Sequence, residues 1–287
     1  MTTTPASLEQ EAARAAHGLP ELIAAAEHAA TAVTAGRHAR QRPGRSDTFW
    51  QFRDYAPGDP SSSIDWRQSA RLERRLLVRQ TEWEQPQTLL IWCDGDEDFD
   101  FAGGKRPSKR FRGQIIALAL AMVLLRSSER AGLWGGAEPP VSGPQSIPSL
   151  AHRLLLRQAK LSDIAPVPGA HVLLVSDFHR PPEELQSAFA RIRDAHGRPM
   201  AVVVEDPLEE TFPYSGATRF EGPGGTFRRR FGDAGSVKDA YQEQRQSHHE
   251  ALKKSVRLPQ ELVTFHTTDQ SPAPLLLSLL QRMSEDG

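Results

Sequence analysis

The sequence has very little cysteine, because Cys93 is the only one among its 287 residues. A single thiol excludes an internal disulfide framework and a zinc site built from several thiolates. Long apolar runs are also missing. The longest one, residues 115–125, is well short of the roughly 20 residues that a membrane-spanning helix needs. The first residues show no basic segment followed by an apolar one, so we expect no secretion signal and a cytoplasmic location.

The chain carries almost no net charge. Its 35 Lys and Arg residues balance 36 Asp and Glu residues, which gives a formal net charge of −1. This balance argues against a role in coating nucleic acid. Residues 37–79 form a locally basic stretch with interleaved aromatic residues, but acidic residues alternate with its arginines. We therefore expect Arg–carboxylate pairs there rather than a surface for single-stranded nucleic acid, with Trp50 and Trp66 as core or interface anchors.

Common catalytic signatures are scarce as well. No Gly-rich loop is followed by Lys and Ser or Thr, so the sequence does not predict nucleotide hydrolysis. The ten histidines are scattered without the His-Glu-x-x-His spacing, and the adjacent His248 and His249 are expected on a solvated helix face. Cys93 ends an apolar strand, and we expect it to pack there as a small hydrophobic residue.

From residue 86 onward, apolar strands and helices alternate regularly. Strands are expected at residues 88–93, 131–134, 171–176, 200–205 and 262–265, and helices at 110–126, 149–160, 182–196, 237–256 and 272–283. This alternation predicts a doubly wound α/β domain over residues 86–285, with a mostly parallel sheet covered on both faces. Before it we expect a disordered arm (1–18) and, over 19–85, an N-terminal helix with a strand-rich extension.

An acidic loop follows the first expected strand. Asp94, Asp96 and Asp98 alternate in this loop, and Asp177 follows the strand at 171–176. If the two strands are neighbours, the four carboxylates face one crevice at the carboxyl edge of the sheet, where the carboxyl ends of its parallel strands meet. Two like charges about 4 Å apart repel by roughly 4 kcal/mol at an effective dielectric constant of about 20.

That repulsion can be removed in several ways. Mg²⁺ or Ca²⁺ would bind such oxygen ligands, one carboxylate could take up a proton, and the simplest alternative is a solvated acidic turn. Basic residues close in the sequence could also neutralise the group, namely Lys105, Arg106, Lys109, Arg110 and Arg112.

A long ordered motif lies between residues 52 and 71. Its residues are Phe52, Arg53, Tyr55, Pro57, Gly58, Asp59, Ile64, Asp65, Trp66, Ser69, Ala70 and Arg71. The motif resembles the signature of the family known as domain of unknown function 58, and the resemblance covers about residues 36–285. It implies a von Willebrand A-like domain with a metal-ion-dependent adhesion site, Asp-x-Ser-x-Ser, after its first strand. It also implies a protein-binding adaptor that works with a MoxR-type AAA+ ATPase in chaperone-like maturation of other proteins.

The sequence departs from that pattern at the adhesion site. Asp94 matches the first ligand and Asp177 the late aspartate, but Asp96 and Asp98 replace the two serines. The usual threonine has no clear counterpart; Ser142 and Ser146 are the candidates. Four aspartates exceed the charge of a divalent ion, so they would weaken its attraction for an acidic partner. The resemblance thus implies a non-enzymatic adaptor with a degenerate site that holds at most one Mg²⁺ or Ca²⁺. For the motif residues, structural contacts are the expected role.

An enzymatic alternative remains open. A strand followed by Asp94 and Asp96 also resembles the first motif of haloacid-dehalogenase-type phosphohydrolases, in which the two act as nucleophile and general acid/base beside Mg²⁺. Lys160 would then bind phosphate, and Asp177 or Asp233 would be the late metal ligand. Against this, about 87 residues of unrelated pattern precede the strand. Residues 222–225 and 228–230, rich in glycine and arginine respectively, are expected to form an exposed loop of unknown use.

Overall fold

The computed structural model describes residues 19–34, 49–56, 61, 64–71, 75–81, 86–136, 138–156, 160–163, 168–222 and 228–284. The expected arm (1–18) and three motif residues (Pro57, Gly58 and Asp59) lie outside these ranges. The chain divides into two compact units, one made of residues 41–86 and the other of residues 1–40 together with 87–287. We call the first the extension and the second the α/β unit.

The α/β unit is built on a six-stranded sheet in the order β10-β7-β6-β3-β4-β5. Five strands are parallel: β3 (Thr88–Cys93), β4 (Arg130–Leu133), β6 (His171–Ser176), β7 (Arg198–Glu205) and β10 (Leu262–Thr267). The short β5 (Val141–Ser142) pairs with β4 in the antiparallel sense at one edge. All five parallel strands coincide with those predicted from the apolar runs, and the doubly wound α/β fold is confirmed. β5 was not predicted.

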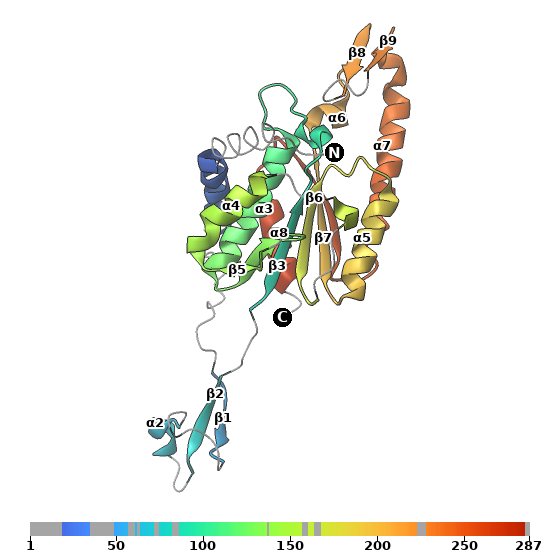
Figure 1. Ribbon diagram of the computed structural model, residues 1–287. Helices are drawn as coiled ribbons and strands as arrows, with labels where there is room; N and C mark the ends of the chain where they lie inside the picture. Colours follow the sequence, from blue (N-terminus) through green and yellow to red (C-terminus); the bar gives the residue numbers. More distant parts are fainter. Residues whose placement is uncertain are drawn as a thin grey trace. The chain divides into compact units, whose positions relative to one another are not determined.

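Helices cover both faces of this sheet (Figure 1). One layer contains α3 (Lys109–Arg126), α4 (Ile147–Leu155) and α8 (Ala273–Ser284), and the opposite layer contains α5 (Pro182–Asp194) and α7 (Lys238–Lys253). Side chains of a strand alternate between faces, so β3 contributes Leu89 and Ile91 to the first core and Leu90 and Trp92 to the second. The unbroken apolar strands follow from this burial on both faces.

Helix α3 is the most deeply buried helix of the described chain. Residues 113–125 are all buried, because the helix lies between the sheet and the helices α4 and α8. Ser108 caps its N-terminus by accepting a hydrogen bond from the backbone N–H of Phe111 at 3.2 Å. Among the described residues no helix is both long and apolar enough to cross a membrane.

The N-terminal helix, residues 19–34, packs on the core of the α/β unit. Leu22, Ala26, Ala30 and Val33 are fully buried in the same cluster as α3, and Glu27 forms an ion pair with Arg126. From the sequence alone this helix is expected to belong to the extension. Its apolar face instead completes the helical layer over α3, because the spacing of these four residues places them on one side of the helix.

The extension contains β1 (Phe49–Asp54), the short helix α2 (Trp66–Ser69) and β2 (Leu77–Thr81), with β1 and β2 antiparallel. Asp65 caps α2 by accepting a hydrogen bond from the backbone N–H of Gln68 at 3.0 Å. Ser69 Oγ donates to the carbonyl of Asp65 and accepts from the N–H of Leu77. These two motif residues therefore stabilise the extension itself.

Other motif residues of the extension have smaller roles. Phe52 and Arg53 lie in β1 opposite Arg79 and Val78, and Tyr55 continues the ladder by donating its N–H to the carbonyl of Leu76. Ile64 is buried, whereas Ala70 and Arg71 are exposed. Trp66 is 62% exposed, so it is not a core anchor, and its alternative role as an interface anchor stays a prediction. One pair of the expected Arg–carboxylate kind joins Arg75 to Asp54 at 3.9 Å.

A second insertion, missed by the sequence analysis, lies between β7 and α7. It consists of the short helix α6 (Pro207–Thr211) and the hairpin formed by β8 (Thr218–Glu221) and β9 (Arg228–Phe231). Figure 1 shows the hairpin beyond α6, next to the start of α7. The expected exposed segment 228–230 is thus a strand of this hairpin, and its arginines are exposed as expected.

Candidate functional site

The candidate site lies at the carboxyl edge, between β3 and β6. The chain passes from β3 to β4 on one side and then to β6 on the other, so β3 and β6 leave a crevice at this switch in strand order. The predicted neighbourhood of the two strands is confirmed by their parallel pairing. The backbone N–H of Asp94 donates to the carbonyl of Val175 at 2.8 Å, which extends this pairing into the acidic loop.

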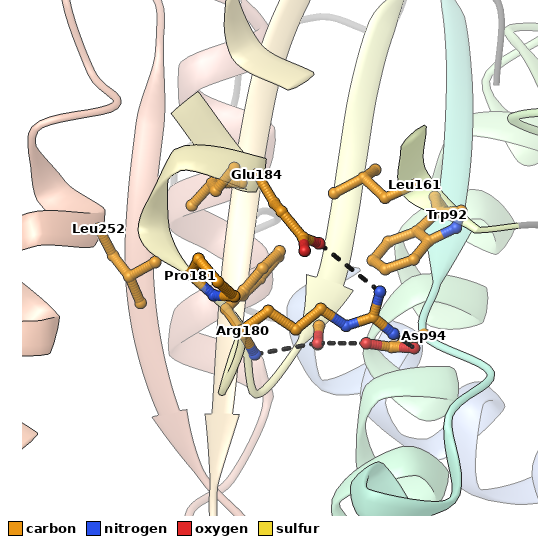
Figure 2. A pocket seen from close by; sticks show the side chains of 10 residues that line it. Trp92, Asp94, Leu161, Arg180, Pro181, Glu184 and Leu252 are labelled. Carbon is orange, nitrogen blue, oxygen red and sulfur yellow. Dashed lines mark hydrogen bonds and ion pairs between the residues drawn. The ribbon is translucent and has the colours of Figure 1, made fainter. Parts of the chain in front are cut away.

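Asp94 is buried at the end of β3, with only 4% of its surface exposed. Its carboxylate accepts hydrogen bonds from Ser176 Oγ at 2.7 Å and from the backbone N–H of Asp96 at 3.0 Å. Arg180 reaches over it at 3.4 Å and also contacts Glu184, as Figure 2 shows. Burial raises the pKa of Asp94 above its usual value, and the hydrogen bond from Ser176 and the charge of Arg180 offset this only in part.

Asp177 follows β6 and is bound to a different cation. Its carboxylate lies 2.7 Å from Nζ of Lys109, which is 1% exposed and also lies 2.7 Å from Glu209. His179 contacts the same carboxylate at 3.5 Å. Burial opposes ionisation of Asp177, but the charges of His179 and Lys109 hold its pKa below the usual value. Burial likewise opposes the charge on Lys109, yet Asp177 and Glu209 raise its pKa.

The two buried acids at and after the end of β7, Glu205 and Asp206, are also paired with cations of the chain. The carboxylate of Glu205 accepts two hydrogen bonds from Arg245, from Nε at 3.0 Å and from Nη2 at 2.7 Å. His249 Nε2 lies 2.8 Å from the same carboxylate. Asp206 is fully buried and accepts hydrogen bonds from Arg106, from the backbone N–H groups of Gly103 and Leu208, and from the hydroxyl of Thr268. Burial opposes ionisation of both acids, but these donors hold their pKa values below the usual ones.

The four predicted ligand residues do not come together around one point. Asp96 is bound to Arg180, and Asp98 is exposed on the short helix η2 (Glu97–Asp100). Within the described ranges, no three His, Cys, Asp or Glu side chains form a group that could hold a metal ion. The arrangement does not fit the Mg²⁺ or Ca²⁺ site expected from the sequence, because Arg180 and Lys109 already occupy the positions from which a cation would contact Asp94 and Asp177.

A cleft of about 330 Å³ opens beside this charge network. We call it the α7 cleft, since α7 provides most of its wall; its residues are Asp177, His179, Glu205, Tyr241, Gln244, Arg245, His248 and His249. His248 Nε2 lies 2.8 Å from the carbonyl of Phe178 and therefore carries the proton there. The prediction that His248 and His249 form a solvated face is wrong, because both are half-buried against the sheet edge.

Other predicted site residues lie elsewhere or have local roles. Ser146 donates to the carbonyl of Ser142 at 3.0 Å, beside β5. Lys160 is exposed. Asp233 caps the short helix η6 (Ala234–Val237) by accepting hydrogen bonds from the backbone N–H groups of Gly216 and Gly235. Cys93 is buried, as predicted, and burial raises its pKa to about 12. A thiol with such a pKa is not reactive at neutral pH.

The partners of the predicted acids were the residues that the sequence analysis missed. Arg180, Glu205, Glu209 and Arg245 were not considered, and Lys109 appeared only as one of several basic residues near the acidic loop. A usable signal existed for two of them. Lys109 is the first residue of the helix whose middle, residues 115–125, is the longest apolar run of the chain, and Arg180 lies within four residues of the buried strand β6.

Comparison with known proteins identifies the family. The family model described as "Protein of unknown function DUF58" matches residues 51–251, which is well over half of the chain. The chain belongs to this family. Its match runs from the motif in the extension through the carboxyl edge to α7. No curated protein matches the sequence.

Among solved structures, the chain is similar to the conserved hypothetical protein BatB from Bacteroides thetaiotaomicron. The alignment has 11% sequence identity and a TM-score of 0.40, and covers 70% of this chain and 100% of the BatB chain. The fold assignment of this DUF58 protein rests on its own strand order and helical layers.

Proposed function

We propose that this DUF58 protein is a non-enzymatic protein-binding adaptor of the cytoplasm, and that its carboxyl edge is the surface that contacts a partner. The proposed partner is a MoxR-type AAA+ ATPase or its protein client, as the family resemblance implies. Binding at this edge needs no metal ion.

One observation carries the proposal: the buried carboxylates at the carboxyl edge are neutralised by cations of the chain itself. The three ion pairs are Arg180 with Asp94, Lys109 with Asp177, and Arg245 with Glu205. Such pairs hold the loops after β3, β6 and β7 in one arrangement. A preformed polar surface of this kind suits contact with another protein, because little ordering is left to be done on binding.

The phosphohydrolase alternative has less support. Both oxygens of Asp94 already accept hydrogen bonds from the chain itself, which makes them less available to attack a substrate. Asp96 contacts Arg180 instead of lying free as a general acid. A metal-dependent turnover of a generic phosphoester, lost in an Asp94→Asn variant, would favour this alternative over the adaptor.

Co-elution with the MoxR-type AAA+ ATPase of the same cell tests the adaptor directly. We expect the two purified proteins to elute together on size exclusion, with and without EDTA. An Asp98→Arg variant changes an exposed side chain at the carboxyl edge, and it should weaken the complex about tenfold by reversing one surface charge. The matched control is Asp194→Arg, an equally exposed aspartate at the C-terminal end of α5.

The control should bind as the wild type does. If no complex forms, or if both variants bind equally well, the carboxyl edge is not the contact surface for this ATPase.

A further inference from the structure

The β8–β9 hairpin concentrates positive charge in a chain that has almost none overall. Residues 218–231 include four arginines and one glutamate, whereas the whole chain has a net charge of −1. The side chains of Arg219 and Arg228 are 68% and 69% exposed, and both contact Glu221, at 2.9 and 3.5 Å. The single carboxylate of Glu221 thus contacts two guanidinium groups. Because the hairpin has no further acidic residue, its net charge is positive.

Strand pairing places most of this charge on one face. Arg219 lies opposite Arg230, and Glu221 lies opposite Arg228. Because side chains alternate along a strand, these four share one face, which we call the basic face, and Phe220, Arg229 and Phe231 share the other. Like charges directly opposite each other destabilise a pair of strands. Arg219 and Arg230 therefore repel each other, and Glu221 on the same face contacts Arg219.

The other face of the hairpin is fixed by aromatic contacts. Phe220 lies 5.0 Å from the ring of Tyr214 and 5.8 Å from that of Phe231, and Arg229 lies over Phe231 at 5.0 Å. Phe212 joins the same cluster and contacts Tyr241, a wall of the α7 cleft, at 4.8 Å. The hairpin is thereby attached to the candidate site. Its described aromatic rings are engaged with one another, so they do not offer stacking platforms for the bases of a nucleic acid.

We propose that the basic face binds an acidic segment of a partner protein. Carboxylates of that segment would lie between Arg219 and Arg230 and beside Arg228, where they would relieve the repulsion between the paired arginines. This inference rests on the proposed adaptor function and deepens it, because it gives the chemistry of the partner surface next to the carboxyl edge.

The test is a titration by fluorescence anisotropy with two labelled probes, a peptide of about ten glutamates and an oligothymidylate of about the same length. The basic-face variant carries Arg219→Ala, Arg228→Ala and Arg230→Ala. The matched control carries Arg130→Ala, Lys254→Ala and Arg257→Ala, three exposed cations at the opposite edge of the sheet. Thermal unfolding of both variants checks that they are folded, and the basic-face variant should melt no lower than the wild type.

We expect the wild type to bind the glutamate peptide, and the basic-face variant to bind it about tenfold more weakly, while the control keeps wild-type affinity. Equal losses in both variants, absence of peptide binding, or tighter binding of the oligothymidylate would overturn the proposal. The titration needs no cellular partner. A negative result here with a stable ATPase complex would refute the basic face alone, and peptide binding without any complex would refute only the adaptor.

Discussion

Lys109 is the residue on which the charge balance of the carboxyl edge depends most. Its ammonium group is almost completely buried and contacts Asp177 and Glu209, both at 2.7 Å. Two carboxylates on one buried cation would repel each other if that cation were removed. A lysine in this position thus takes the role that a bound cation has in sites rich in aspartate.

A Lys109→Met variant keeps the length of the side chain and removes its charge. We expect the free energy of unfolding at pH 7 to fall by about 3–5 kcal/mol, because one partner of a buried ion pair is lost. Urea denaturation measures this. The control Lys105→Met changes an exposed lysine nearby and should stay within about 0.5 kcal/mol of the wild type. A loss below about 1 kcal/mol for Lys109→Met would show that the pair contributes little.

Asp94 and Asp177 should respond to pH with opposite signs. The pKa of Asp177 is lowered in the folded state, so its charge adds stability above the unfolded value of 3.8, and this contribution disappears as pH falls through the folded pKa. The pKa of Asp94 is raised, so stability is lost as pH rises from 3.8 through the folded value.

Asn variants make this difference measurable by urea denaturation at several pH values from about 2.5 to about 7, on both sides of the unfolded value. Relative to the wild type, Asp177→Asn should become less stable as pH rises, and Asp94→Asn should become more stable. Both variants keep an oxygen acceptor, so packing changes little. Parallel pH curves for the two variants would contradict the assignment of a paired charge to Asp177 and a burial penalty to Asp94.

Among the elements, the close packing of α3 against the sheet determines where Lys109 meets the carboxyl edge. Gly113 allows this approach: a Cβ atom there would lie 2.7 Å from Cγ1 of Val175 and 3.2 Å from Cζ of Phe99. Lys109 lies one turn before Gly113 on the same helix, and Val175 lies two residues before Asp177. The packing of this one glycine therefore helps bring the lysine to its carboxylate.

We expect Gly113→Ala to lower the free energy of unfolding by about 1–2 kcal/mol, although alanine normally stabilises a helix by about 1 kcal/mol relative to glycine. Thermal or urea unfolding gives the value. Gly232→Ala is the control, because a Cβ atom there meets nothing within 4 Å. A more stable Gly113→Ala variant would mean that α3 can move away from β6 at no cost.

The elements themselves could be predicted where burial produces a regular pattern. The five parallel strands are mostly continuous apolar runs, and α3, α4, α5 and α8 each bury several apolar residues, so the sequence alone indicates them. The β8–β9 hairpin escaped prediction because Phe220 is the only apolar residue of β8, and the aromatic rings that it contacts, those of Phe212, Tyr214 and Phe231, lie outside that strand.

The candidate site could be predicted in place but not in composition. Asp94 and Asp177 follow the neighbouring strands β3 and β6 at the carboxyl edge, as the strand pattern predicts. Which cation meets each acid depends on long-range packing: Lys109 and Asp177 are 68 residues apart, and Arg180 and Asp94 are 86 apart. No local pattern encodes such pairs, so the sequence alone indicates the acids but not the cations of the chain that pair with them.

At the scale of the whole molecule, the carboxyl edge combines three features that fit a protein-binding surface. Its buried acids are neutralised internally, the α7 cleft opens beside them, and the basic face adds positive charge next to the cleft. The match to the DUF58 family runs through the extension and this edge alike. We propose that Lys109 and Arg180, and not a metal ion, hold the carboxyl edge together.

Isothermal titration calorimetry with Mg²⁺, Ca²⁺ and Mn²⁺ tests that claim most directly. The wild type is compared with an Asp94→Ala, Asp177→Ala double variant, at ion concentrations up to about 1 mM. We predict that neither protein shows saturable binding of any of the three ions. Saturable binding by the wild type that disappears in the double variant would contradict it, and would mean that a cation displaces Lys109 or Arg180 from the carboxylates.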